Sequence, residues 1–316
     1  MLIYVVRRVG QSVVVLLVVA LIVFLLLHFL PGGPARAILG ARATPQEVHN
    51  FNVANGYNKP VVVQYFDWLN QLVHGHFGFS QKYNESVTSL FATDLPKSLL
   101  ITVPAFVLAL LVALPTGLFQ ASRRNKFIDH VITAVSLVFY SMPVFWLALL
   151  LILYVAVEGH LLPPEAPQGT SVGQILAHAN GLILPIATLS LITIALFTRY
   201  LRSAAIDNLL QDYVRTAKAK GVSDRRILWG HVFKNALLST VTLVGLALPG
   251  VVSGAVVTET VFNYPGVGYL FWTSAQSRDY PVVLGFLLMV GAATVIGSLL
   301  ADLSLVALDP RIRLQK

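Results

Sequence analysis

Long apolar runs alternate with short polar segments along the whole chain. A membrane core about 30 Å thick needs roughly 20 consecutive apolar residues in a helix, and six runs reach that length. They lie at about residues 9–30, 99–119, 127–157, 182–200, 236–261 and 282–308. The pattern predicts an all-α polytopic membrane protein with six transmembrane helices.

The composition supports a membrane location. Only 11% of the 316 residues are charged and 56% are hydrophobic, whereas a soluble domain carries about 25% charged residues. So few charges cannot build a water-facing shell around the apolar groups. The chain also has no cysteine, which excludes disulfides and thiolate metal sites.

The first apolar run has an alternative interpretation as a cleaved signal peptide. Arg7 and Arg8 precede it, and the sequence Ala-Arg-Ala at residues 35–37 resembles a cleavage site. The run is longer than the apolar core of about 7–15 residues that is typical of a signal peptide. We therefore expect a retained signal anchor that forms the first span.

The distribution of Lys and Arg predicts the orientation, because cytoplasmic loops are enriched in these residues. With the N-terminus inside the cell, the inner segments carry 16 of the 22 basic residues and the outer segments carry six. Both termini are then cytoplasmic. The same distribution explains the formal net charge of +8, so no nucleic-acid partner is needed to account for it.

The expected organisation is a single transmembrane domain with two long loops. The domain covers residues 1–316, with an extracytoplasmic insertion at 31–96, a cytoplasmic loop at 201–235 and core helices at about 97–308. In the insertion, Thr44 is placed to cap a helix that begins at Pro45, and residues 60–73 are a candidate amphipathic helix. This insertion suits a lid or a docking surface better than a separate enzyme.

The chain lacks the sequence motifs of the common hydrolases. It has no G-x-x-x-x-G-K-[ST] phosphate loop, no H-E-x-x-H and no G-x-S-x-G, so we expect no catalytic residues and no nucleotide or metal site. His74 and His76 form the only close histidine pair, without an obvious third ligand. Glu158, Glu259 and Asp302 lie near the ends of spans. Because ion-coupled carriers place charges near the membrane centre, the energy source is expected to lie in another protein.

One dense basic block, residues 211–238, interrupts the apolar pattern. Apolar residues at three- and four-residue spacing predict a helix over 206–220, and Gly221 follows where a left-handed helix stop is expected. Ser223 can cap a second helix that has Asp224 in its first turn. The block then forms a rigid projection that fits a socket on another protein. The alternative is an amphipathic helix lying on the anionic inner leaflet.

The block resembles the EAA loop of ABC importer permeases, in which E-A-A, three residues and a glycine are followed by nine residues and I-x-L-P. Arg215, Thr216 and Ala217 occupy the E-A-A places, Gly221 is the glycine, and residues 231–234 occupy the last four places. The glutamate, isoleucine and proline of the motif are absent. The stretches "YVRTAKAKG" and "HVFKNALL" are closer to the version of the peptide and nickel importers.

Further segments resemble the B-type permease subunit of dipeptide and oligopeptide importers. They are "RRVGQSVVVLLVVALIVFLLLHFLPGGPA", "GYNKPVVVQYFDWL", "GHFGFS", "TETVFNYPGVGYL", "RDYPVV" and the ending "LDPRIR". In "GHFGFS", His76 stands where an aspartate is usual, which weakens a metal-binding role for it. Together these segments cover the chain from its beginning to its end.

The resemblance implies a type I ABC importer permease in the bacterial inner membrane. Its partners would be a homologous C-type permease, two ATPase subunits that hold ATP and Mg, an extracytoplasmic binding protein, membrane lipid and a peptide substrate. A coupling helix at about residues 215–222 would transmit ATPase closure into alternating access. The residues implied to contact the ATPase are Asp212, Tyr213, Arg215, Thr216, Ala217, Lys218, Ala219, Lys220, Gly221 and Val222.

A second set of candidates belongs to the pore and the partner permease. Gly250 and Gly254 form a G-x-x-x-G in the fifth run, for packing against the partner permease or within this chain. Pro143 and Pro249 are hinges or, as we expect, plain kinks. Glu259, with the following "NYPGVG", shapes the outer mouth or a structural turn.

Alternative functions stay open at this level. The same machinery can carry nickel chelates, glutathione or another small solute in place of peptides. A channel or an ion-coupled carrier is a different class, which buried charges near the membrane centre would favour. A membrane-surface signalling subunit is a third possibility, in which the basic block would bind lipid alone.

Overall fold

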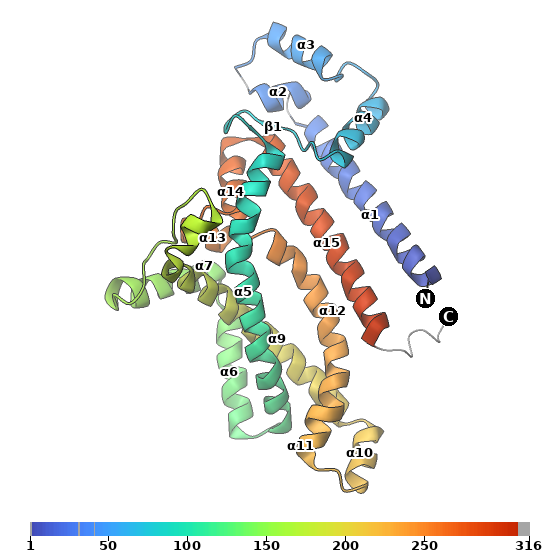
Figure 1. The fold of residues 1–316 in the computed structure, drawn as a ribbon, viewed down its shortest axis with the longest axis vertical. Coiled ribbons are helices and arrows are strands. Elements are labelled where there is room, and N and C mark those ends of the chain that lie inside the picture. The colour runs from blue at the N-terminus through green and yellow to red at the C-terminus, as the bar shows by residue number, and fades with distance from the viewer. Residues whose placement is uncertain (1, 31, 41, 309–316) are drawn as a thin grey trace.

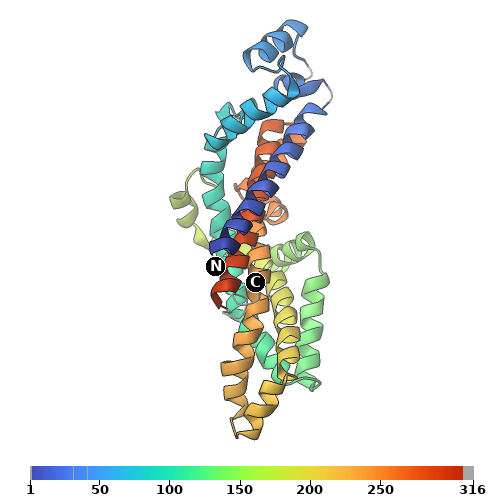
Figure 2. The same ribbon diagram turned by 90° about the vertical axis from the view of Figure 1, so that its right-hand side faces the viewer.

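The computed structural model describes residues 2–30, 32–40 and 42–308, and the chain is mostly helical. Five of the described helices are long and apolar enough to cross a membrane, or six spans result if one bent pair counts as a span. The molecule is elongated, as two views at right angles agree (Figure 1, Figure 2). The prediction of a helical polytopic membrane protein is confirmed, whereas the predicted count of six spans requires that the bent pair be one span. The ending at residues 309–313 lies outside the described residues.

The five long helices correspond to five of the predicted runs. They are α1 (Leu2–His28), α5 (Val87–Ser122), α9 (Ile183–Leu209), α12 (Phe233–Val252) and α15 (Tyr280–Leu308). Helix α5 begins well before its apolar run, because the Ser86 side chain caps it by accepting a hydrogen bond from the Ser89 amide at 3.1 Å. Helix α5 therefore already includes residues 87–96, the last part of the stretch assigned to the insertion.

The third predicted run is not one continuous helix. It consists of α6 (Phe127–Ser141), α7 (Val144–Leu151) and a π-helix, η1 (Ile152–Glu158), and the two halves meet at an angle of 102°. Pro143 precedes α7 and Met142 is extended, as expected where proline disfavours helix at the residue before it. The prediction of a plain kink at Pro143 is wrong, because the chain turns sharply there.

Small residues allow the spans to pack closely. A Cβ at Gly117 of α5 would lie 2.8 Å from the Thr198 carbonyl oxygen of α9. Between α12 and α15, a Cβ at Gly245 would lie 2.8 Å from the Gly297 carbonyl oxygen and would collide with Ala301. The backbones of each pair can approach to these distances only without side chains at these positions.

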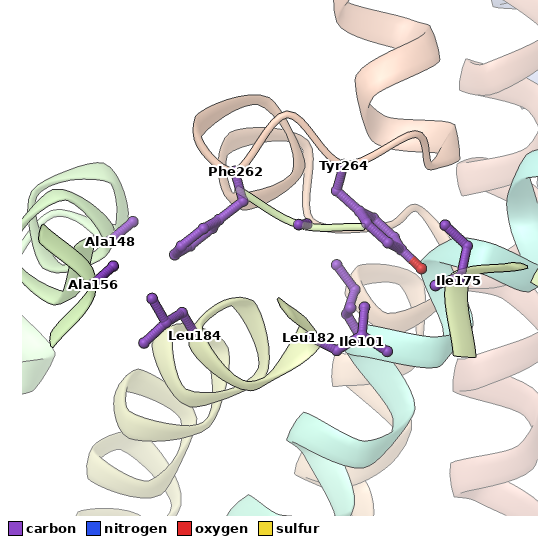
Figure 3. Close-up of a cluster of buried hydrophobic side chains, with 9 residues drawn as sticks. Ile101, Ala148, Ala156, Ile175, Leu182, Leu184, Phe262 and Tyr264 are labelled. Atoms are coloured by element: carbon purple, nitrogen blue, oxygen red, sulfur yellow. The ribbon is translucent and has the colours of Figure 1, made fainter. Parts of the chain in front are cut away.

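A buried cluster joins the helices near the middle of the molecule (Figure 3). It is centred on Phe262 and Tyr264, which precede α14 (Val267–Ser277) and are fully buried. The Tyr264 hydroxyl donates to the Lys97 carbonyl oxygen at 2.6 Å, and burial raises the pKa of this hydroxyl, so it stays protonated. The other members are Ile101, Ala148, Ala156, Ala166, Ile175 of α8 (Val172–Leu176), Leu182 of the 3-10 helix η2 (Ala179–Leu182) and Leu184.

The outer insertion lies at one end of the molecule (Figure 1). It contains α2 (Gly33–Leu39), α3 (Pro45–Ala54), α4 (Val61–Val73) and an antiparallel pair of short strands, β1 (Phe79–Ser80) and β2 (Glu85–Ser86).

The local predictions for this insertion are confirmed. The Thr44 hydroxyl accepts a hydrogen bond from the Glu47 amide, and Glu47 accepts one from the Thr44 amide at 2.7 Å. These bonds lower the pKa of the Glu47 carboxyl. Helix α4 lies against α1, where the Tyr65 hydroxyl donates to the Leu17 carbonyl oxygen at 3.0 Å.

Candidate functional site

The basic block forms two short helices at the end of the molecule opposite the insertion (Figure 1). These are α10 (Asp212–Ala219) and α11 (Asp224–Ile227). The single helix predicted over 206–220 is wrong, because α9 ends at Leu209 and the chain turns before α10 begins. The Tyr213 hydroxyl donates to Asn208 Oδ1 at 3.1 Å across this turn. The turn folds α10 back, so that its apolar side contacts the end of α9.

The helix stop at Gly221 is confirmed. Gly221 has a φ of +73°, its amide donates to the Lys218 carbonyl at 2.9 Å, and the Val222 amide donates to the Ala217 carbonyl at 3.1 Å. This pair of bonds is the Schellman pattern, in which a left-handed residue ends a helix and satisfies its last carbonyls. Ala217 and Val222 also both pack on one buried apolar cluster.

The start of α11 agrees only in part with its prediction. Ser223 is the N-cap residue and is extended, but its side chain makes no capping hydrogen bond. Asp224 does lie in the first turn, and its carboxylate pairs with Lys218 at 3.4 Å. This exposed ion pair links α10 to α11 and contributes little stability alone. The chain continues through a π-helix, η3 (Leu228–Val232), into α12.

Apolar residues attach the two short helices to the spans. We call this cluster the foot. Its buried members come from the ends of α5, α9 and α12 that lie next to the loop and from the loop itself. They are Leu118, Ala121, Leu201, Ala205, Val214, Ile227, Val232 and Ala236. Helices α10 and α11 therefore share one buried cluster with three spans.

The opposite side of α10 is uncovered. We call it the tip, and it is formed by Arg215, Thr216, Lys218, Ala219, Lys220 and Gly221, all of which are exposed. Arg215 has a side chain that is 77% exposed, and its pair with Asp212 at 3.5 Å lies in water. The tip is thus a positively charged surface that lies opposite the buried foot.

The predicted coupling residues fall on both sides of α10. Tyr213, Ala217 and Val222 pack on the foot, while the others are exposed. Val214 is missing from the predicted set, although it is 2% exposed and belongs to the foot. Its place on the apolar stripe of the helix was the signal that could have identified it.

A second group of predicted residues lies where α12 ends. The G-x-x-x-G prediction is corrected, because α12 ends at Val252 and Gly254 lies beyond it with a φ of +69°. Gly250 and Gly254 therefore do not share one helix face. A Cβ at Gly250 would meet no atom within 4 Å, so its packing against a partner stays a prediction. Helix α12 continues through Pro249, whose carbonyl accepts the Ser253 amide at 2.8 Å.

Glu259, in α13 (Val256–Val261), is fully buried within the chain. The amides of Ala255 and Tyr269 donate to its carboxylate at 3.2 and 2.9 Å, and the Ser98 hydroxyl and the Gly268 amide donate to it as well. The carboxylate therefore binds α5, α13 and α14 together, as the structural-turn alternative expects.

Glycines make room for this carboxylate. A Cβ at Gly254 or Gly266 would lie 2.5 Å from one of its oxygens, and a Cβ at Gly268 would lie 2.9 Å away. The "NYPGVG" segment and Gly254 thus leave the space that one buried acid occupies. We call Glu259, Ser98 and these three glycines the Glu259 cage.

One buried ion pair was missed by sequence reasoning. Arg202 of α9 makes two hydrogen bonds of 2.7 Å to Asp129 of α6, and the Asp129 side chain is 1% exposed. Asp129 also accepts the Asn125 amide at 2.9 Å, and its carbonyl accepts the Gln120 side chain. This network fixes the α5–α6 turn to α9. An aspartate in the first turn of an apolar helix was its only signal in the sequence.

The histidine pair lies between the insertion and α15. His74 and His76 line a cavity of about 730 Å³ there. In the described parts of the chain, no group of three or more His, Asp or Glu side chains is placed to hold a metal ion.

Two family models together match most of the chain. The model described as "Binding-protein-dependent transport system inner membrane component" matches residues 113–314, and its N-terminal companion matches residues 1–102. The foot and the tip fall within the first match, and the outer insertion falls within the second.

Several curated proteins are similar over nearly their full length. The oligopeptide transport system permease protein AppB of Bacillus subtilis is 35% identical over 98% of both chains. The dipeptide transport system permease protein DppB of Escherichia coli is 32% identical over 100% of both chains. The probable D,D-dipeptide transport system permease protein DdpB of Escherichia coli is 35% identical over 97% of this chain and 96% of its own.

Proposed function

The chain belongs to the family of binding-protein-dependent transport system inner membrane components, and from this premise we propose that it is a B-type permease subunit of an ATP-driven peptide importer. It would form half of a translocation path, with a homologous C-type permease as the other half. Two ATPase subunits would bind on the cytoplasmic side of the two permeases, one of them at the tip of this chain, and a substrate-binding protein would dock on the outer insertion. Both termini would be cytoplasmic.

The single observation that carries this proposal is the loop of α10 and α11. A charged, uncovered tip stands on a foot that is packed into three spans. The sequence has no phosphate loop, so the chain needs mechanical input from a protein that has one. A tip that moves under ATPase closure would shift α5, α9 and α12 as packed bodies, which is how rigid-body alternating access operates.

The buried charges favour this class over an ion-coupled carrier. In the described spans, Asp94, Asp129 and Asp302 pair with Lys97, Arg202 and Arg8, and Glu259 is held in its cage. Each of these carboxylates is thus engaged within the chain, whereas a carrier needs carboxylates that bind and release the coupling ion. The names of the relatives favour peptides as cargo over nickel chelates or glutathione.

The test compares two glycines with the same backbone requirement. Gly221 at the tip and Gly75 in the outer insertion both have positive φ, and a Cβ at either would meet no atom within 4 Å. Gly221→Asp should abolish stable assembly with the ATPase subunits or the stimulation of ATP hydrolysis by substrate-loaded binding protein. Gly75→Asp should leave ATPase assembly unchanged.

A third variant separates charge from shape. Gly221→Asn has nearly the same size as the aspartate variant and tolerates the left-handed conformation equally, so it should retain more coupling. Assembly and stimulated ATPase activity that both survive Gly221→Asp unchanged would overturn the coupling role of the tip.

A further inference from the structure

A basic pocket lies beside the loop that carries the tip. We call it the shoulder pocket. It has a volume of about 730 Å³ and lies between the α5–α6 turn and the α10–α11 loop. Five cationic residues line it together with a single acidic residue, Asp224. The cations are Arg123, Arg124, Lys126, Lys218 and Arg225.

Most of this positive charge is not neutralised by the protein. Within the described chain, Lys218 is the only one of the five cations that has a carboxylate partner, and that partner is Asp224. Arg123, Arg124, Lys126 and Arg225 leave four positive charges around one pocket. Such a concentration of like charge favours an anionic ligand.

Helix α6 begins beside the pocket, with Lys126 as its N-cap residue. Its first turn also carries Asp129, whose carboxylate is paired with Arg202, so the preference for an anion rests on the side-chain cations. A phosphate group fits these cations better than a carboxylate, because it offers more acceptor oxygens.

The pocket also has an apolar wall. Phe119 and Leu210 line it and are 44% and 57% exposed, and Arg123 stacks over the Phe119 ring at 5.8 Å from its centroid. A ligand that is both anionic and apolar would cover these side chains, whereas free phosphate would leave them in water.

The position of the pocket matches the surface of a membrane. The apolar run of α5 ends at about residue 119 and the helix at Ser122. Arg123 and Arg124 are the first charged residues after it, as is typical of the boundary between hydrocarbon and headgroups. The α10–α11 loop reaches further along the long axis than the α5–α6 turn does (Figure 1). The pocket therefore lies in the step between the membrane surface and the projecting loop.

We propose that the shoulder pocket binds the phosphate headgroup of an anionic phospholipid from the cytoplasmic leaflet, with an acyl chain along Phe119 and Leu210. The bound lipid bridges the α5–α6 turn and the α10–α11 loop, and so connects the base of the tip to the membrane. The leaflet assignment rests on the orientation in the proposed function. The pocket binds one lipid molecule, which distinguishes it from a helix lying on the membrane surface.

The test uses the complete importer, purified and placed in nanodiscs of phosphatidylcholine with a minor share of phosphatidylglycerol. Native mass spectrometry then counts the lipids that stay bound. The wild-type complex should retain phosphatidylglycerol in preference to phosphatidylcholine. The double variant Arg124→Gln/Lys126→Gln should lower the apparent lipid affinity about 30-fold, from the usual contribution of two surface cations.

Two controls accompany this variant. Arg7→Gln/Arg199→Gln removes the same charge from two exposed residues outside the pocket, and it should leave lipid retention unchanged. The charge-conserving exchange Arg124→Lys/Lys126→Arg should retain the lipid, which separates loss of binding from loss of folding.

Three results would overturn the proposal. One is retention of both lipids without preference. Another is binding of glycerol phosphate or inorganic phosphate, with the same dependence on Arg124 and Lys126, in a complex that holds no lipid. The last is an ATPase subunit that crosslinks to Ser122→Cys in a complex that holds no lipid. If the complex couples ATP hydrolysis but gives one of these results, only the lipid site is contradicted. If Gly221→Asp leaves assembly and stimulated ATPase activity unchanged, the proposed function itself is contradicted.

Discussion

At the residue scale, the buried acids hold neighbouring helices together through hydrogen bonds. Glu259 is enclosed by backbone amides and one hydroxyl, and Asp129 is enclosed by Arg202 and a backbone amide. Removing one partner of such a group leaves the other partners buried and unpaired, which costs more than the bond itself contributed. These residues therefore maintain the geometry on which a moving permease depends.

Replacement of Glu259 tests this role. Glu259→Ala would leave the Ser98 hydroxyl and the amides of Ala255, Gly268 and Tyr269 without their acceptor, so we expect a loss of about 3 kcal/mol in unfolding free energy. Titration of the purified permease with a denaturing detergent measures it. Glu158→Ala is the matched control, because Glu158 is exposed and its loss should change stability by less than about 0.5 kcal/mol. Equal stability of the two variants would contradict the role of the Glu259 cage in holding these helices together.

At the element scale, local signals in the sequence located most helices and long-range contacts decided where they break. Thr44, Pro45 and Gly221 sit where capping rules place them, because a cap depends on residues within one turn. The break between α9 and α10 instead places Val214 in the foot, and the sharp turn at Pro143 places Ala148 and Ala156 in the cluster around Phe262 and Tyr264. Neither contact can be recognised from periodicity alone.

The candidate site was predictable to the same extent. The tip and its glycine stop follow from the sequence, since they lie within about ten neighbouring residues. The Asp129–Arg202 pair joins positions 73 residues apart, and the shoulder pocket joins two loops that are further apart still. Only the folded chain brings those residues together.

The close contact between α12 and α15 can be tested at Gly245, with Gly250 as the comparison. Gly245→Ala would force its new methyl group against Gly297 and Ala301, so we expect the permease alone to lose about 1–3 kcal/mol of stability. Gly250→Ala meets open space and should leave the permease alone unchanged within about 0.5 kcal/mol. Thermal unfolding of both variants in one detergent makes the comparison.

The same pair of variants also tests whether Gly250 packs against the partner permease. If Gly250 packs against that partner, then Gly250→Ala should weaken the assembled pair while the single chain stays as stable as the wild type. Size-exclusion chromatography of the co-expressed permeases measures the fraction that stays assembled as a pair. A Gly250→Ala variant that destabilises the permease alone more than Gly245→Ala does would contradict the packing described for α12 and α15.

At the scale of the whole molecule, the insertion and the basic loop lie at opposite ends (Figure 1). The insertion containing α2, α3 and α4 caps one end, and α10 and α11 form the other, with five or six spans between them. A binding protein and an ATPase could therefore act on one chain simultaneously without competing for surface. This separation requires that the membrane place the two ends in different compartments.

The absence of cysteine makes that requirement simple to test. His49→Cys in α3 and Lys220→Cys at the tip each introduce a single thiol at an exposed position. In cells with a permeable outer envelope and an intact inner membrane, a membrane-impermeant maleimide should label His49→Cys at once. It should label Lys220→Cys only after the inner membrane is opened, because the positive-inside bias places the basic tip in the cytoplasm. Labelling of Lys220→Cys in closed cells would reverse the orientation, and with it the assignment of the tip to the ATPase side and of the insertion to the binding protein.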